Sequence, residues 1–174
     1  WNKHHDACID RIVLYSTRLN EEEIEDTKLD ACIVTGAFSG DSRKLAVGIS
    51  DHSRTHKGYI EIRSTETLKL LHEPIPTPSA PAQIAWSPLE DRIVVLCQQG
   101  ELFVFDLEAD EGAIWRDTAE KEHSHVNPTV AYTPNGKTVV ELGSDGRIRV
   151  WNSAGSQLRS PPLEPTEQGF WSFS

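Results

Sequence analysis

Side chains that could bind a metal gather near the start of the chain, where His4, His5, Asp6 and Cys8 lie close together. Zinc prefers four such ligands in a fixed tetrahedral arrangement. No second cluster at a spacing typical of zinc sites follows, and polar residues of an exposed loop have the same composition. We therefore expect no metal site and no cofactor.

A second group, Asp51, His52, Ser53 and His56, contains the residue types of a Ser-His-Asp triad. A serine becomes a nucleophile only where a base and an orienting acid are held in the right geometry. The Gly-x-Ser-x-Gly turn that positions such a serine is missing from this stretch. A polar hairpin loop accounts for these residues equally well, so the sequence predicts no catalytic residue and no enzyme activity.

Two further groups could bind a protein partner. Acidic runs are usually solvated, but loops also carry many contacts. A Trp-Arg pair is typical of binding hot spots when it is exposed, although Trp115 could instead pack inside a sheet. The candidate docking residues are Glu21, Glu22, Glu23, Glu25, Trp115 and Arg116, with a second acidic run at 108–111.

Charge and composition exclude several classes of partner. The 174-residue chain has a formal net charge of −10, whereas nucleic acids and anionic membranes attract clustered Lys and Arg. No apolar run is long enough to span a bilayer. The three cysteines are widely spaced and odd in number, which favours a reducing, cytoplasmic location. The chain opens on Trp1 and lacks Met, so we expect it to be part of a longer protein.

The elements that position these residues repeat along the chain. Three segments, 36–64, 84–106 and 130–152, share an order of features: an apolar strand ending in an aromatic residue, Ser or Thr, a turn, and two further apolar strands. The aromatic residues are Phe38, Trp86 and Tyr132, and the third strands close on Ile62, Phe105 and Trp151. A period of about 45 residues with four strands per unit is typical of β-propeller blades.

Local signals also favour strands. The turn Pro134-Asn135-Gly136 has residues that fix φ or tolerate positive φ, and Ser144-Asp145-Gly146 predicts the next hairpin. The only helix-prone stretch is 20–26, within a long acidic connection from about 17 to 29. Two Pro-rich stretches, 72–78 and 160–165, are expected to connect an outer strand to the next inner strand.

The third segment, with His125 ahead of it, Asp145 in its second turn and Trp151-Asn152 at its end, resembles the WD40 repeat. In that family a His, a Ser or Thr, an Asp and a Trp form a hydrogen-bonded network inside the blade. The resemblance implies that His125, Asp145 and Trp151 are structural. Glu141 stands about where the family has Ser or Thr, which departs from the pattern.

The resemblance implies an all-β chain of about three to four antiparallel four-stranded blades, with repeats at 1–63, 64–106, 107–152 and the start of another at 153–174. An outer strand at about 9–17 would belong to an earlier blade. Closed rings in this family take about six to eight blades, so we expect an open arc. Other parts of a longer chain, a partner, or self-association could complete it.

The expected function is a non-catalytic protein-interaction scaffold that binds a protein or peptide. The alternatives are a propeller that binds carbohydrate or another small ligand, and the sensor domain of a signalling protein with an NTPase elsewhere. No nucleic acid or membrane partner is expected.

Overall fold

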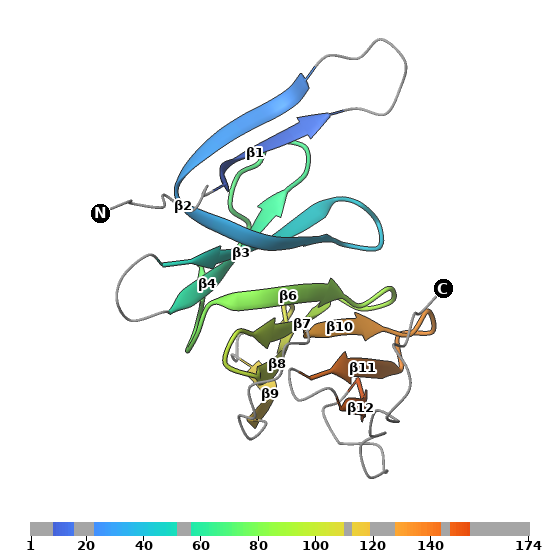
Figure 1. Cartoon of the computed structure of the whole chain (residues 1–174). Coiled ribbons are helices and arrows are strands. Elements are labelled where there is room, and N and C mark those ends of the chain that lie inside the picture. The colour runs from blue at the N-terminus through green and yellow to red at the C-terminus, as the bar shows by residue number, and fades with distance from the viewer. Residues whose placement is uncertain are drawn as a thin grey trace, which may run out of the picture.

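The computed structural model describes residues 9–15, 23–51, 57–109, 113–118, 128–143 and 147–153. All regular elements in these ranges are β-strands, and all named strand pairs are antiparallel (Figure 1). The predicted all-β architecture is therefore confirmed. Within the same ranges, no helix is long and apolar enough to cross a membrane.

The strands form three sheets that follow one another along the chain. The first sheet contains β1 (Ile9–Tyr15), β2 (Glu23–Phe38), β3 (Lys44–Ser50), β4 (Gly58–Ser64) and β5 (Ile75–Thr77). The second contains β6 (Pro81–Trp86), β7 (Arg92–Cys97), β8 (Glu101–Asp106) and β9 (Ala113–Thr118). The third contains β10 (Thr129–Tyr132), β11 (Thr138–Leu142) and β12 (Ile148–Asn152).

The sheets pack face to face because their central strands are apolar on both sides. Strand β6 contacts both β2 and β10, so the second sheet lies between the other two. We call the contact of the first and second sheets the first junction, and that of the second and third sheets the second junction. Along β7, Ile93 and Val95 face the first junction, whereas Val94 and Leu96 face the second.

The two junctions contain the main hydrophobic cores. The core of the first junction consists of Ala46, Ile60, Ile62, Ile84, Trp86, Ile93, Val95, Cys97, Phe103, Phe105 and Leu107. That of the second consists of Val94, Leu96, Leu102, Val104, Val130, Val139 and Trp151. A third core lies on the side of the first sheet that faces away from the second, and contains Ile12, Leu45, Val47, Ile49 and Leu68.

The strand register corrects one predicted equivalence. Trp151 pairs with Val139, and Phe105 pairs with Ile93 at the same position of the second sheet. In the first sheet this position pairs Leu45 with Arg63, so Arg63 rather than Ile62 is the equivalent of Trp151. The apolar character of Ile62 favours it as the closing residue of the strand. It lies one residue before Arg63, however, and faces the first junction.

The beginning of the chain also differs from the prediction. Strand β1 was expected to belong to an earlier blade, but it pairs with the first half of β2 in the first sheet, with Ile12 opposite Thr27. The helix-prone stretch becomes strand from Glu23 onward. An acidic segment can adopt an extended conformation when a neighbouring strand satisfies its backbone hydrogen bonds.

The outer strands differ in a similar way. The stretch 72–78 was expected to be a connection, but Ile75–Thr77 within it is the outer strand β5. Pro76 is tolerated there because an edge strand leaves one row of backbone groups unpaired. The third sheet has three strands among the described residues, and the second Pro-rich stretch, 160–165, lies outside them.

Two of the three cysteines lie in the described residues, and Cys32 is disulfide-bonded. Cys97 is a free, buried thiol in the first junction, and burial raises its pKa to about 12. A buried thiol with such a pKa remains protonated and is chemically inert.

Candidate functional site

Three equivalent turns lie side by side at one end of the sheets. We call this end the turn face and define it by residues 39–43, 87–91 and 133–137, which follow β2, β6 and β10. A Cβ atom on Gly40 would lie 3.1 Å from the Pro88 carbonyl oxygen, and one on Gly136 would lie 3.2 Å from Leu89 Cγ. Each turn therefore packs closely against the next.

The same local chemistry builds the turns. In the first turn, Ser39 Oγ donates to Asp41 Oδ1 at 2.6 Å and accepts from the Lys44 N–H at 2.9 Å. In the third, Thr133 Oγ1 contacts Asn135 Oδ1 at 2.8 Å, and Gly136 adopts the predicted positive φ of 65°. Side chains that form hydrogen bonds with nearby backbone groups in this way are typical of tight turns.

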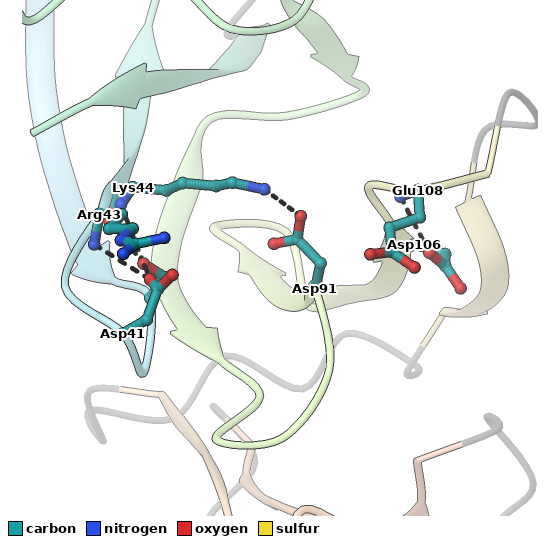
Figure 2. A network of polar contacts seen from close by, with 7 residues as sticks. Asp41, Arg43, Lys44, Asp91, Asp106 and Glu108 are labelled. Atoms are coloured by element: carbon teal, nitrogen blue, oxygen red, sulfur yellow. Dashed lines mark hydrogen bonds and ion pairs between the residues drawn. The ribbon is translucent and has the colours of Figure 1, made fainter.

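An open groove runs beside the contact between the first two turns. Its volume is about 290 Å³, and it is lined by Ser39, Gly40, Asp41, Lys44, Trp86, Ser87, Pro88, Leu89, Glu90, Asp91 and Glu108. Lys44 forms an ion pair with Asp91 across the groove, so the first sheet is tied to the second at this end (Figure 2). The lining also includes the carboxylates of Asp41, Glu90 and Glu108.

Hydrogen bonds lower the pKa of two carboxyl groups in this region, those of Asp41 and Asp106. The Ser39 hydroxyl and then the Arg43 backbone N–H hold the pKa of Asp41 below its ordinary value of 3.8. Burial alone would raise the pKa of Asp106, but the Glu108 N–H and the Arg92 guanidinium lower it overall. Figure 2 shows Asp41, Asp91, Asp106 and Glu108 in this polar network. The groove is therefore negatively charged at neutral pH.

One large apolar side chain lies beside these charges. Leu89 is 70% exposed at the tip of the second turn and lines the groove. Trp86 lines the inner wall, where it is only 9% exposed. A groove with a negatively charged rim and apolar walls can accept a segment that carries both basic and apolar side chains.

A second cleft lies near the beginning of β6 and β10, at the opposite end of these strands from the turn face. It has a volume of about 450 Å³ and is lined by Val34, Pro81, Ala82, Gln98 and Pro128. The described residues of its lining carry no charged side chain, so they differ chemically from those of the groove on the turn face.

The resemblance to the WD40 repeat predicts a hydrogen-bonded network that includes His125, Asp145 and Trp151. His125 and Asp145 lie outside the described residues. Trp151 is 4% exposed, and its indole N–H donates to Glu141 Oε2 at 3.1 Å. Arg149 Nη1 lies 3.4 Å from Glu141 Oε1. Glu141 therefore accepts the tryptophan hydrogen bond in this sheet, and Arg149 balances its buried charge.

The predicted docking residues do not gather at one site in the described structure. Glu21 and Glu22 lie outside it, whereas Glu23 and Glu25 are on β2 in the first sheet. Trp115 and Arg116 are on β9, the predicted outer strand of the second sheet. Glu108, the first residue of the second acidic run at 108–111, lines the groove. The docking roles of these residues stay predictions.

The other candidate chemistry also lies largely outside the described residues. This is the case for His4, His5, Asp6 and Cys8, and for His52, Ser53 and His56. Asp51 is described, and its backbone N–H donates to the Lys57 carbonyl at 2.9 Å. In the described part of the chain, no three His, Cys, Asp or Glu side chains are grouped so that they could hold a metal ion.

The sequence prediction missed most of the groove. Asp41, Lys44, Leu89 and Asp91 were not selected, because each was assigned only to a turn. A usable signal was present, since the two turns follow Phe38-Ser39 and Trp86-Ser87 at equivalent positions of adjacent repeats. Adjacent repeats place equivalent turns at the same end of neighbouring sheets, where their side chains meet.

Comparison with known proteins identifies the architecture. Residues 84–161 match the family model of the anaphase-promoting complex subunit 4 WD40 domain. A chain in the crystal structure of the mitotic checkpoint complex superposes with a TM-score of 0.67 at 13% identity, over 88% of this chain and 44% of that one. The chain therefore has the fold of propeller blades, and residues 84–161 of it match a WD40 domain.

Other propellers give the same result. The Dos1 propeller superposes with a TM-score of 0.64 at 14% identity, over 82% of this chain and 35% of that one. BamB from Moraxella catarrhalis gives 0.63 at 15% identity, over 86% and 41%. The periodic tryptophan protein 2 homolog of Mus musculus is 26% identical over 112 residues, or 59% of this chain and 12% of that protein. The chain thus spans less than half the length of each of these proteins.

Proposed function

We propose that these WD40-type blades act as a non-catalytic protein-interaction scaffold, and that the groove on the turn face binds a peptide segment rich in basic and apolar residues. The groove carries the proposal, because it combines an exposed Leu89 with the carboxylates of Asp41, Glu90 and Glu108. Among the described lining residues, Lys44 is the one cation and is paired with Asp91, whereas Glu90 is paired with Arg92 beside the groove. A basic segment would therefore gain complementary charge from the groove.

The comparisons support the scaffold role at a coarser level. The matching family model describes a WD40 domain of a complex subunit, and one similar chain comes from a multiprotein checkpoint complex. The partners of those two proteins are not assigned to this chain. The basic and apolar character of the partner proposed here rests on the groove of this chain.

Fluorescence anisotropy with a short labelled peptide of alternating Arg and Leu tests this function. We expect saturable binding that weakens as salt is added, because surface charges are screened. The double variant Glu90→Lys/Glu108→Lys should weaken binding by about tenfold, since both changes place repulsive charge on the rim.

Glu66→Lys/Glu73→Lys is the control matched in charge, because both residues are exposed and do not line the groove. It should leave affinity within about twofold, as expected for a distant surface charge. Equal losses in the control and the double variant would show that only the net charge of −10 attracts the peptide. That result, or a lack of binding, would contradict the groove as a docking site.

A further inference from the structure

The groove on the turn face contains an ion pair of the same kind as the contact expected with a basic partner. Lys44, the first residue of β3, extends its side chain from the first sheet to the Asp91 carboxylate in the second turn (Figure 2). Both residues line the groove. The Lys44 side chain therefore occupies the position at which a lysine or arginine of a bound peptide would reach Asp91.

The side chain of Lys44 can leave Asp91 without a change in the backbone. The Lys44 N–H donates to Ser39 Oγ at 2.9 Å, and the Lys44 carbonyl accepts from the Ser39 N–H at 2.9 Å, so the main chain is fixed at this point. The Lys44 side chain is 30% exposed, and the stem of a lysine is flexible. An ion pair with this exposure is only weakly stabilising, because water and salt screen it.

Asp91 is held in place more firmly than its partner. Its carbonyl accepts from the Leu107 N–H at 2.8 Å, and its side chain is only 16% exposed. A charge with limited access to water is attracted more strongly to an approaching opposite charge than a fully solvated one. The Asp91 carboxylate is therefore stabilised by a cation, whether that cation is Lys44 or a basic side chain of the peptide.

The second junction shows that stacked sheets do not require this ion pair. Arg92 and Lys137 lie at the equivalent positions there, since Arg92 begins β7 and Lys137 directly precedes β11. Both are cations, and Arg92 Nε donates instead to Asp106 Oδ2 of its own sheet at 3.0 Å. The second sheet packs on the third nonetheless. The pair of Lys44 and Asp91 is therefore a feature of the groove rather than a requirement of blade packing.

We propose that Lys44 is an internal competitor of the peptide, which covers Asp91 in the unbound chain and gives it up to a basic side chain of the partner. This inference rests on the groove as the docking site and adds a regulation to it. An arginine gains from the exchange, because its guanidinium donates two hydrogen bonds to one carboxylate, whereas an ammonium acts as a point charge. The apparent affinity is lowered according to the fraction of molecules in which Lys44 covers Asp91.

Fluorescence anisotropy with the labelled peptide of alternating Arg and Leu tests this competition in the unaltered protein, Lys44→Gln, Asp91→Asn and the double variant. Lys44→Gln should raise the affinity about fivefold, the scale of a partly exposed ion pair. In the Asp91→Asn background the same change should alter the affinity by less than about twofold, because no carboxylate remains for Lys44 to cover. The removal of a positive charge alone would raise the affinity equally in both backgrounds.

Lys69→Gln is the matched control, because Lys69 is exposed and does not line the groove. It should change the affinity by less than about twofold, and circular dichroism checks that all variants remain folded. Equal gains in both backgrounds, or no gain for Lys44→Gln, would overturn the competition but leave the groove as a docking site. If the peptide binds neither the unaltered protein nor Lys44→Gln, the docking site itself is wrong, and the competition with it.

Discussion

The two blade junctions have the same geometry but different chemistry. On the side of the second sheet that faces the first junction, Val95, Phe103 and Phe105 are apolar, and the two phenyl rings stack with centroids 5.9 Å apart. The register equivalents in the third sheet are Glu141, Arg149 and Trp151, which form a buried polar network. The same backbone positions can thus support a junction through apolar packing or through paired charges.

A buried ion pair also occurs in the first sheet, so buried charges are not confined to the third sheet. On its outward side, Arg63 Nε donates to Glu61 Oε2 at 2.7 Å, and both residues are less than 9% exposed. Arg63 occupies the position of Phe105 and Trp151. The position of a residue along its strand therefore fixes which side of the sheet its side chain faces. The side chains around it decide whether an apolar or a charged residue is stable there.

The largest effect is expected in the apolar junction. Phe105→Ala should lower the free energy of unfolding by about 3–5 kcal/mol, because it removes the stacked ring and leaves a cavity. Denaturant unfolding measures the change, with Leu89→Ala as the control, since Leu89 is 70% exposed. A loss below about 1 kcal/mol for Phe105→Ala would mean that the first junction is not close-packed.

A smaller effect is expected in the polar junction. Glu141→Leu should cost about 3 kcal/mol, because it leaves the Arg149 charge and the Trp151 N–H without their carboxylate. The double variant Glu141→Leu/Arg149→Met should recover part of this loss, because both members of the ion pair are then replaced by apolar side chains. If the losses of the two single variants simply add in the double variant, the ion pair is not coupled as the structure indicates.

The smallest effect concerns pH on the turn face. The folded pKa of Asp106 is below 3.8, so its contribution to stability is present above the unfolded pKa and is lost as pH falls through the folded value. Asp106→Asn should cost about 0.2–1 kcal/mol at pH 7 and flatten the decline in stability below about pH 4. Urea unfolding across this range measures it, and Glu73→Gln serves as the exposed control. An unchanged pH profile in Asp106→Asn would contradict the assigned hydrogen bonds.

The repeating features of the fold could be predicted because they arise locally. Alternating apolar residues and the turn Pro134-Asn135-Gly136 specify strands and hairpins within a few positions. The equivalence of Arg63 could not be predicted in this way, because its buried partner Glu61 is seen only once the strands are paired. The pairing of β1 with an acidic part of β2 is likewise a tertiary effect that overrides local propensity.

The groove shows a similar limit. Asp41, Asp91 and Glu108 come from three separate turns, and each alone is an ordinary polar loop residue. Only the packing of the first two sheets brings them together. The acidic character of the run at 108–111 was visible in the sequence, but its place beside Leu89 was not.

The most direct test of the proposed docking site is an NMR titration of the ¹⁵N-labelled chain with the Arg and Leu peptide. If the groove is the docking site, backbone amide shifts will move mainly in 39–44 and 87–91 and at Glu108, the segments that line the groove. Shifts centred instead on Val34, Ala82 and Gln98, the residues of the opposite cleft that carry a backbone N–H, would place the docking site there and contradict the proposal.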